Sequence, residues 1–145
     1  MTDCRNSARP VNTNLATLQR AGLLVLATLV VGCASEIPHR STAFRDLELQ
    51  DRPRVVRVEV DTVVEWGSIN LNRRITAGTV WRQVGQIPEG QVFRPVQGVF
   101  TIEGAHVHEA MLVLRGNTLE GFFLTHEKAY VQAKPAIQLK LTEGR

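Results

Sequence analysis

A period of two in the carboxy-terminal part of the chain restricts its fold more than any other feature. Valines alternate with charged residues over 56–61, and isoleucine and leucines alternate with polar residues over 137–142. Successive side chains of a β-strand point to opposite faces, so both segments are typical of strands with one buried and one wet face. Between residues 55 and 145, only the brief stretch 125–130 has helical spacing.

Short apolar runs separated by turn residues fill the space between these two segments. The Gly116-Asn117 pair between 111–115 and 118–124 predicts a β-hairpin. Pro95 cannot donate to a sheet ladder, which predicts an edge, a bulge or a corner between two strands. The chain has 145 residues, which suits one domain of ordinary size. We therefore expect an all-β fold over residues 55–145, either a small antiparallel β-barrel or a β-sandwich.

The amino-terminal part carries the pattern of an export signal. Three arginines and a single aspartate precede an apolar run of twelve residues, 21–32, in which Thr28 is the only polar side chain. A membrane-spanning helix needs ~20 apolar residues to cross ~30 Å of hydrocarbon, so this run is too short to span. A positive flank followed by a short apolar run and small residues instead predicts a secretory signal peptide over residues 1–32.

The residues that end the apolar run add an anchor to this signal. Val30-Val31-Gly32-Cys33 resembles the lipobox of bacterial lipoproteins. The resemblance implies that the sulfur of Cys33 receives a diacylglycerol, that a peptidase cuts just before it, and that the new amino group is acylated. Ala34 and Ser35 follow, and neither is the aspartate associated with inner-membrane retention. The resemblance thus implies an exported protein, lipid-anchored to the cell envelope at the outer membrane and facing the periplasm.

The next segment, residues 33–54, begins at the lipidated cysteine and is otherwise polar. It contains Pro38, Pro53 and charged residues of both signs. This composition predicts a solvated tether between lipid and domain, with one ordered turn around 44–49.

The turns and short strands of the β-rich part resemble a second family. The turn Gly85 to Gly90, the segment 116–123 and the later Tyr130 resemble bacterial SH3-like domains over roughly residues 75–131. The resemblance implies cell-wall or peptide binding, and it carries over no ligand residue. The family's usual opening strand is missing, and 97–114 is longer than that family's pattern.

Histidines supply the one candidate for metal chemistry. His106 and His108 would place both rings on one face of a strand, and His126 follows the next strand. Three nitrogens plus water is a catalytic zinc arrangement, so a metal-binding or hydrolytic domain centred on these residues is an alternative. The simpler interpretation is that His106 and His108 occupy the exposed start of a strand, which leaves the chain without cofactor.

Other chemistry finds little support in the sequence. No serine lies in a G-x-S-x-G turn, and no thiol remains free once Cys4 is removed and Cys33 is acylated. No spacing pairs the carboxylates for glycoside hydrolysis; those considered are Glu103, Glu109, Glu120 and Glu127. Phe122 and Phe123 should point to opposite faces of a strand, so one of them could be exposed and mark a contact surface.

Charge provides little argument for nucleic-acid binding. The formal net charge is +3, from 17 basic and 14 acidic residues, but residues 1–32 hold three of the arginines and one of the aspartates. The mature chain therefore keeps 14 basic and 13 acidic residues, a net of +1. We expect a non-enzymatic binding or structural module, anchored to the membrane through Cys33, with an envelope protein or peptidoglycan as partner and no nucleic acid.

Overall fold

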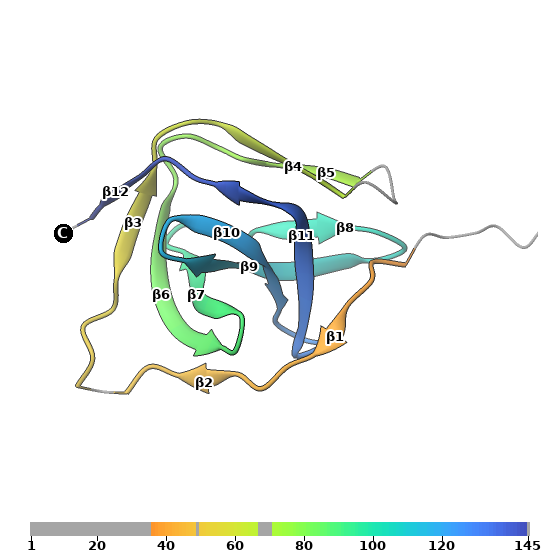
Figure 1. The fold of residues 1–145 in the computed structure, drawn as a ribbon, viewed down its shortest axis with the longest axis horizontal. Coiled ribbons are helices and arrows are strands. Elements are labelled where there is room, and N and C mark those ends of the chain that lie inside the picture. The colour runs from red at the N-terminus through yellow and green to blue at the C-terminus, as the bar shows by residue number, and fades with distance from the viewer. Residues whose placement is uncertain (1–35, 49, 67–70, 145) are drawn as a thin grey trace, which may run out of the picture. The chain divides into compact units, whose positions relative to one another are not determined.

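Antiparallel strands account for the architecture that the chain adopts (Figure 1). The structure is a computed structural model that describes residues 36–48, 50–66 and 71–144, all within the unit Ala34–Arg145. These residues form no helix, which confirms the all-β prediction, and none of them belongs to a helix long and apolar enough to cross a membrane. The strands are β1 Arg40–Ser41, β2 Arg45–Asp46, β3 Val55–Val58, β4 Thr62–Trp66, β5 Leu71–Ile75, β6 Val80–Ile87, β7 Gly90–Pro95, β8 Thr101–Glu103, β9 Val107–Arg115, β10 Thr118–Leu124, β11 Ala129–Gln138 and β12 Leu141–Glu143.

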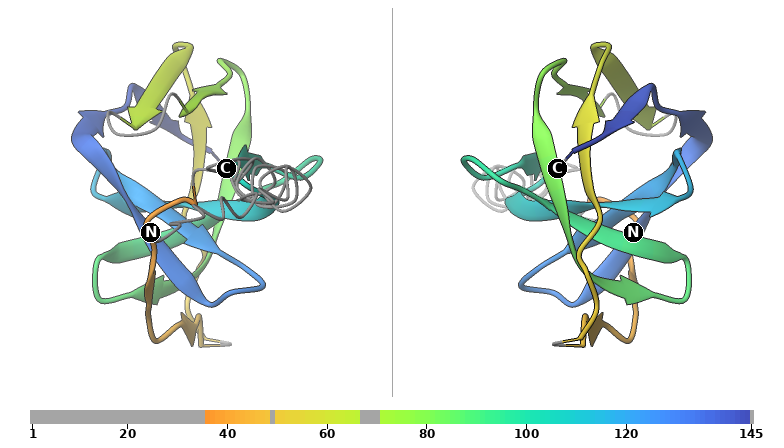
Figure 2. Two further views of the ribbon diagram at one scale, coloured as in Figure 1. Left: turned by 90° about the vertical axis from the view of Figure 1, so that its right-hand side faces the viewer. Right: turned by 90° about the vertical axis from the view of Figure 1, so that its left-hand side faces the viewer.

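The sheet is strongly curved and resembles a small barrel. Its strand order is β12-β3-β6-β7-β9-β10-β11-β4-β5, with β1 on β11, β2 on β6 and β8 on β9. Only Leu139 and Lys140 separate β11 from β12, so the chain that leaves β11 pairs almost at once with β3 near the other end of the order. Figure 2 shows from two sides how the strands wrap around a common interior. The sheet is not closed, and its small barrel-like form agrees with the predicted fold class.

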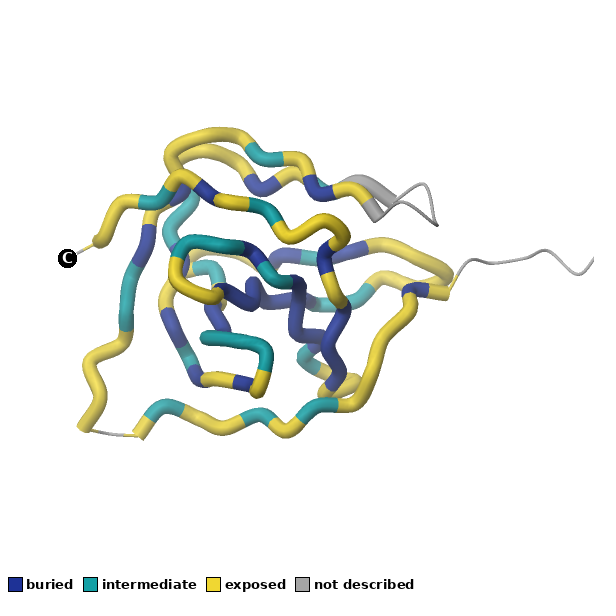
Figure 3. Tube along the Cα trace, viewed as in Figure 1, coloured by how far each residue is buried: buried dark blue, intermediate teal, exposed yellow. Residues whose placement is uncertain are grey.

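The interior is filled by the inward faces of these strands (Figure 3). Phe100 packs edge-on against Trp81, with ring centroids 5.5 Å apart, and stacks on Phe122 at 5.7 Å. Val56 and Val58 are fully buried, as the alternation predicts. Val60 is 47% exposed, contrary to that pattern, because β3 ends at Val58.

The predicted hairpin and corner are both present. Gly116 and Asn117 connect β9 to β10, with Arg115 opposite Thr118 and a positive φ of 61° at Gly116. Pro95 is the last residue of β7, and β8 begins at Thr101. Both strands pair with β9, so of the three alternatives for Pro95 the structure shows a corner between two strands.

The helical spacing of 125–130 does not produce a helix. Residues 125–128 form a turn, Lys128 has a φ of 49°, and β11 begins at Ala129. The reason is tertiary, because this turn must join β10 to the antiparallel β11.

A bulge in β10 fixes two further residues. Leu119 pairs with Leu114 and Gly121 with Val113, which leaves Glu120 as the extra residue. The hydroxyl of Tyr130 donates a hydrogen bond of 2.7 Å to the carbonyl oxygen of Glu120. A Cβ at Gly121 would lie next to the carbonyl oxygen of Val131, at 2.1 Å, so this position admits only glycine without a shift of the backbone.

Part of the segment predicted as a tether packs on the domain. We call residues 36–48 the N-terminal strap. Ile37 is only 2% exposed and belongs to the main core, while Phe44 stacks on Phe123 with centroids 5.0 Å apart. Its two short strands, β1 and β2, pair with β11 and β6. The expectation of a solvated tether is therefore wrong for Ile37 and Phe44, because these apolar side chains have complementary apolar surface to cover, while most other side chains of the strap are exposed.

Candidate functional site

The predicted lipid-anchor residue, Cys33, lies outside the described residues. The described part begins at Glu36, and Ile37 is buried directly after it. His39, in the same segment, is exposed and its Nδ1 lies 2.9 Å from the carbonyl oxygen of Ile37. The lipid anchor stays a prediction from the sequence, and the structure adds where the chain after it becomes fixed.

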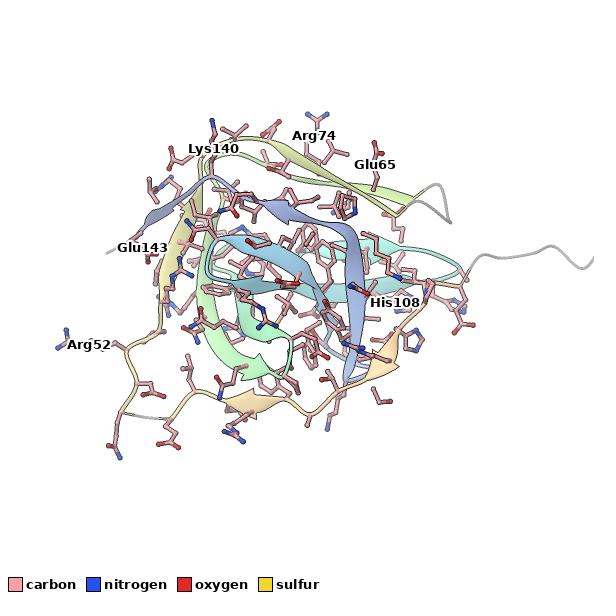
Figure 4. The ribbon with its side chains drawn as sticks, viewed as in Figure 1. Arg52, Glu65, Arg74, His108, Lys140 and Glu143 are labelled. Atoms are coloured by element: carbon pink, nitrogen blue, oxygen red, sulfur yellow. The ribbon has the colours of Figure 1, made fainter. Side chains whose placement is uncertain are left out.

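The three histidines of the metal alternative lie at the same end of β9 but do not converge. His108, labelled in Figure 4, is in β9. Its side chain is 13% exposed, and its Nδ1 lies 2.5 Å from Oε1 of Glu127. His106 precedes the strand in an exposed loop, with its ring centroid 6.5 Å from that of His108. His126 is exposed, and its Nε2 lies 3.9 Å from Oε2 of Glu109.

Two separate histidine–carboxylate pairs therefore replace the predicted triad. Within 36–48, 50–66 and 71–144, no group of three or more His, Cys, Asp or Glu side chains has the geometry to hold a metal ion. The paired carboxylates face their histidines as hydrogen-bond and charge partners. This arrangement can orient a turn, and it does not assemble the three-nitrogen centre that catalytic zinc uses.

The electrostatics of the His108–Glu127 pair favour the ionised carboxylate. Partial burial by itself raises the pKa of Glu127, but the hydrogen bond with His108, a backbone hydrogen bond and the charges of His108 and His126 outweigh it. The pKa of Glu127 is therefore lowered from its ordinary value of 4.5. The pair ties the turn after β10 to the beginning of β9.

The other carboxylates considered for catalysis have structural partners of their own or lie in solvent. Glu120 forms an ion pair of 3.4 Å with Arg115, and Glu109 is the partner of His126. Glu103 is exposed and its backbone pairs with Val107 at the end of β8. Three of the four candidate carboxylates are therefore engaged with basic side chains.

Phe122 and Phe123 do point to opposite faces, but neither is exposed. Phe122 is in the interior, and Phe123 belongs to a second cluster on the outer face. Phe44 of the N-terminal strap covers that cluster. The expected contact surface at one of these rings is therefore wrong, because the chain's own strap fills it.

A different feature of the outer face is marked by no sequence pattern. Arg82 of β6 and Arg94 of β7 lie directly opposite each other, and both are exposed. The two-residue turn Pro88-Glu89 alone would place Arg94 opposite Gln83. A bulge at Val84 shifts the register by one residue and places the two arginines opposite each other. Since bulges leave no clear signal in a single sequence, only the structure identifies this pair.

Comparison with known proteins adds no relative. No family model, no curated protein and no solved structure matches the chain. The likeness to SH3-like domains and to the lipobox accordingly rests on the residues quoted for each.

Proposed function

We propose that the chain is an envelope lipoprotein whose β-domain is a non-enzymatic binding or structural module. Residues 1–32 are the signal peptide, and Cys33 carries the lipid. The observation that carries the proposal is the position of Val30-Val31-Gly32-Cys33 at the end of a twelve-residue apolar run. Acyl chains contribute ~0.8 kcal/mol per buried methylene, so two or three chains on one residue suffice for a stable anchor.

The N-terminal strap supports a short connection between lipid and domain. Ile37 is buried in the main core, only four residues after Cys33. Four residues span at most roughly 14 Å when fully extended. A lipid on Cys33 would hold the domain at the membrane surface, where its partner would be an envelope protein or peptidoglycan close to that membrane. Outer-membrane placement, facing the periplasm, follows from Ala34 and Ser35 through the lipoprotein resemblance.

The arrangement of polar groups supports a binding or structural role over catalysis. Two of the three candidate histidines, His108 and His126, are paired with carboxylates, and three of the four candidate carboxylates have basic partners. Groups held by one another in this way fix the turns and strand ends of the domain, which favours a structural or binding role.

Replacement of each cysteine in turn tests the anchor. Cys33→Ser should block processing of the precursor and remove the protein from the lipoprotein fraction of detergent-treated membranes. Cys4→Ser is the matched control, because Cys4 lies in the part that is removed, and it should change neither. Normal processing and unchanged fractionation of Cys33→Ser would show that the proposal is wrong.

A further inference from the structure

The arginine pair on the outer face lacks the counter-charges that four other arginines of the described residues have. The side chains of Arg82 and Arg94 form no hydrogen bond or ion pair with any residue that the structure describes, although the two residues face each other across β6 and β7. Like charges directly opposite each other on antiparallel strands destabilise the pairing. By contrast, Arg54 contacts Glu143 at 2.7 Å and Arg74 contacts Asp61 at 3.2 Å. Two adjacent cations without partners are what an anion-binding surface requires.

The two arginines line a hollow with an apolar wall. Its volume is about 330 Å³, and its lining residues are Arg82, Arg94, Pro95, Val96, Gly98, Val99, Phe100, Glu109 and Ala110. Val96 and Val99 are 48% and 66% exposed, whereas Phe100 is almost fully buried behind them. This volume is at the lower end of the ~300–1,000 Å³ typical of small-molecule pockets.

One carboxylate faces this hollow and limits its positive charge. Glu109 is among the lining residues, and its Oε2 lies 3.9 Å from Nε2 of His126, outside the hollow's lining. The formal net charge of the lining residues is therefore +1, from two arginines and one glutamate. An anion gains from this field, and a cation does not.

The loop 96–99 lines two hollows. A second hollow of about 590 Å³ shares Pro95, Val96, Val99 and Phe100 with the first, and adds Trp81 and Arg57. The Arg57 guanidinium is engaged there, since it donates to the carbonyl oxygen of Gly78 at 3.2 Å. Of the arginines that line these two hollows, only Arg82 and Arg94 are therefore free. They can contact the anionic head of a ligand, while the valines of the loop 96–99 offer apolar surface to the rest of it.

We propose that this hollow binds a small amphiphilic anion. A carboxylate or phosphate group pairs with the guanidinium groups of Arg82 and Arg94, and an attached apolar chain lies on Val96, Val99 and Phe100. The planar guanidinium presents parallel N–H donors that match carboxylate and phosphate oxygens. The proposal rests on the binding role proposed above and is independent of the lipid on Cys33, so the two can fail separately.

Ligand-observed NMR titrations of the full chain, purified in a neutral detergent, test the site. The probes are n-butyl phosphate, butyrate, inorganic phosphate and 1-butanol, which separate the charge from the apolar chain and phosphate from carboxylate. We expect saturable binding of butyl phosphate or butyrate, weaker binding of inorganic phosphate, and none of butanol. Absence of saturable binding by both amphiphiles at millimolar concentration overturns the proposal. Equal binding of inorganic phosphate and butyl phosphate overturns the apolar half of it.

Substitutions then locate the binding. Arg82→Gln and Arg94→Gln should each weaken it about tenfold, which corresponds to about 1.4 kcal/mol. The double variant Arg45→Gln/Arg52→Gln removes two exposed arginines of the N-terminal segment and should leave affinity unchanged; Arg52 points away from the barrel in Figure 4. If this control loses as much affinity as the hollow variants, net charge explains the binding and the site is refuted.

Two more variants keep the test independent of folding. Glu109→Gln removes the opposing carboxylate and should tighten anion binding, whereas a loss would overturn the assignment. Val99→Asp places a negative charge on the exposed wall without touching either arginine, and it should abolish binding. Unchanged affinity in Val99→Asp would show that the ligand lies elsewhere.

Discussion

Replacing Ile37 by alanine distinguishes a packed strap from a free tether. Ile37 is 2% exposed and lies in the main core cluster, together with side chains of the barrel strands. Substitution of a fully buried isoleucine by alanine costs ~2–5 kcal/mol, because transfer energy is lost and a cavity remains. In a solvated tether the same change would cost roughly 0.5 kcal/mol or less.

Phe44 extends the test to the outer face. Its half-buried ring stacks on Phe123 at an interplanar angle of 24° and covers the second apolar cluster. Substitution of a fully buried phenylalanine by alanine costs ~3–5 kcal/mol, so half-burial with a ring contact predicts a loss of about 2 kcal/mol for Phe44→Ala. The two residues belong to different clusters, so each variant reports on one face of the domain.

Urea-induced unfolding, followed by tryptophan fluorescence, measures both changes. Trp81 is buried at 2% exposure and should report loss of the core. With a slope of ~1–3 kcal/mol per molar urea, a loss of 2 kcal/mol moves the midpoint by roughly 1 M. Val60→Ala is the control, because Val60 is apolar but 47% exposed. If Ile37→Ala moves the midpoint no further than Val60→Ala, the strap does not pack as described.

Three further predictions concern the β9–β11 region. Burial, with the nearby charges of Glu120 and Glu89, raises the pKa of Tyr130 to about 12, so ultraviolet titration of this single tyrosine should show no ionisation near pH 10. The stability that this pKa shift contributes is present below pH 10 and is lost as pH rises towards 12. Ionisation of Tyr130 near pH 10 in the folded protein would contradict its burial. Glu127→Gln should destabilise by roughly 0.2–1 kcal/mol at pH 7, because it weakens a partly exposed pair. The pKa of Glu127 is lowered from 4.5, so the free energies of unfolding of wild type and variant should converge as pH falls through the folded-state pKa. A difference in unfolding free energy that persists in strong acid argues against the pair. Gly121→Ala should cost ~1–3 kcal/mol in thermal or urea unfolding, through overpacking against Val131, and a neutral result would show that the bulge relaxes freely.

The parts of the fold set by local chemistry are predictable from the sequence. Gly116 and Asn117 predict the β9–β10 hairpin because a two-residue turn needs a residue that tolerates positive φ, and Gly116 has one. The alternation over 56–58 predicts the two buried valines of β3. Pro95 predicts an interruption of the strand pairing, although it does not distinguish an edge, a bulge and a corner.

The parts set by tertiary contacts are not predictable in this way. Ile37 and Phe44 lie in a polar segment with the composition of a linker, and their burial depends on surface supplied by strands far along the chain. Helical spacing at 125–130 gives way to a turn because β10 and β11 must pair. The His106–His108 spacing predicts a common face only if both residues are in one strand, and β9 begins between them, at Val107. The meeting of Arg82 and Arg94 depends on the bulge at Val84.

Mass spectrometry of the mature amino terminus tests the central claim most directly. The full chain, isolated from membranes and digested, should give an amino-terminal peptide that begins at Cys33 and carries the added mass of a diacylglyceryl group, with or without an N-acyl chain. No peptide from residues 1–32 should remain in the mature protein. An unmodified Cys33 within an uncleaved chain would contradict the lipoprotein assignment, whatever the domain binds.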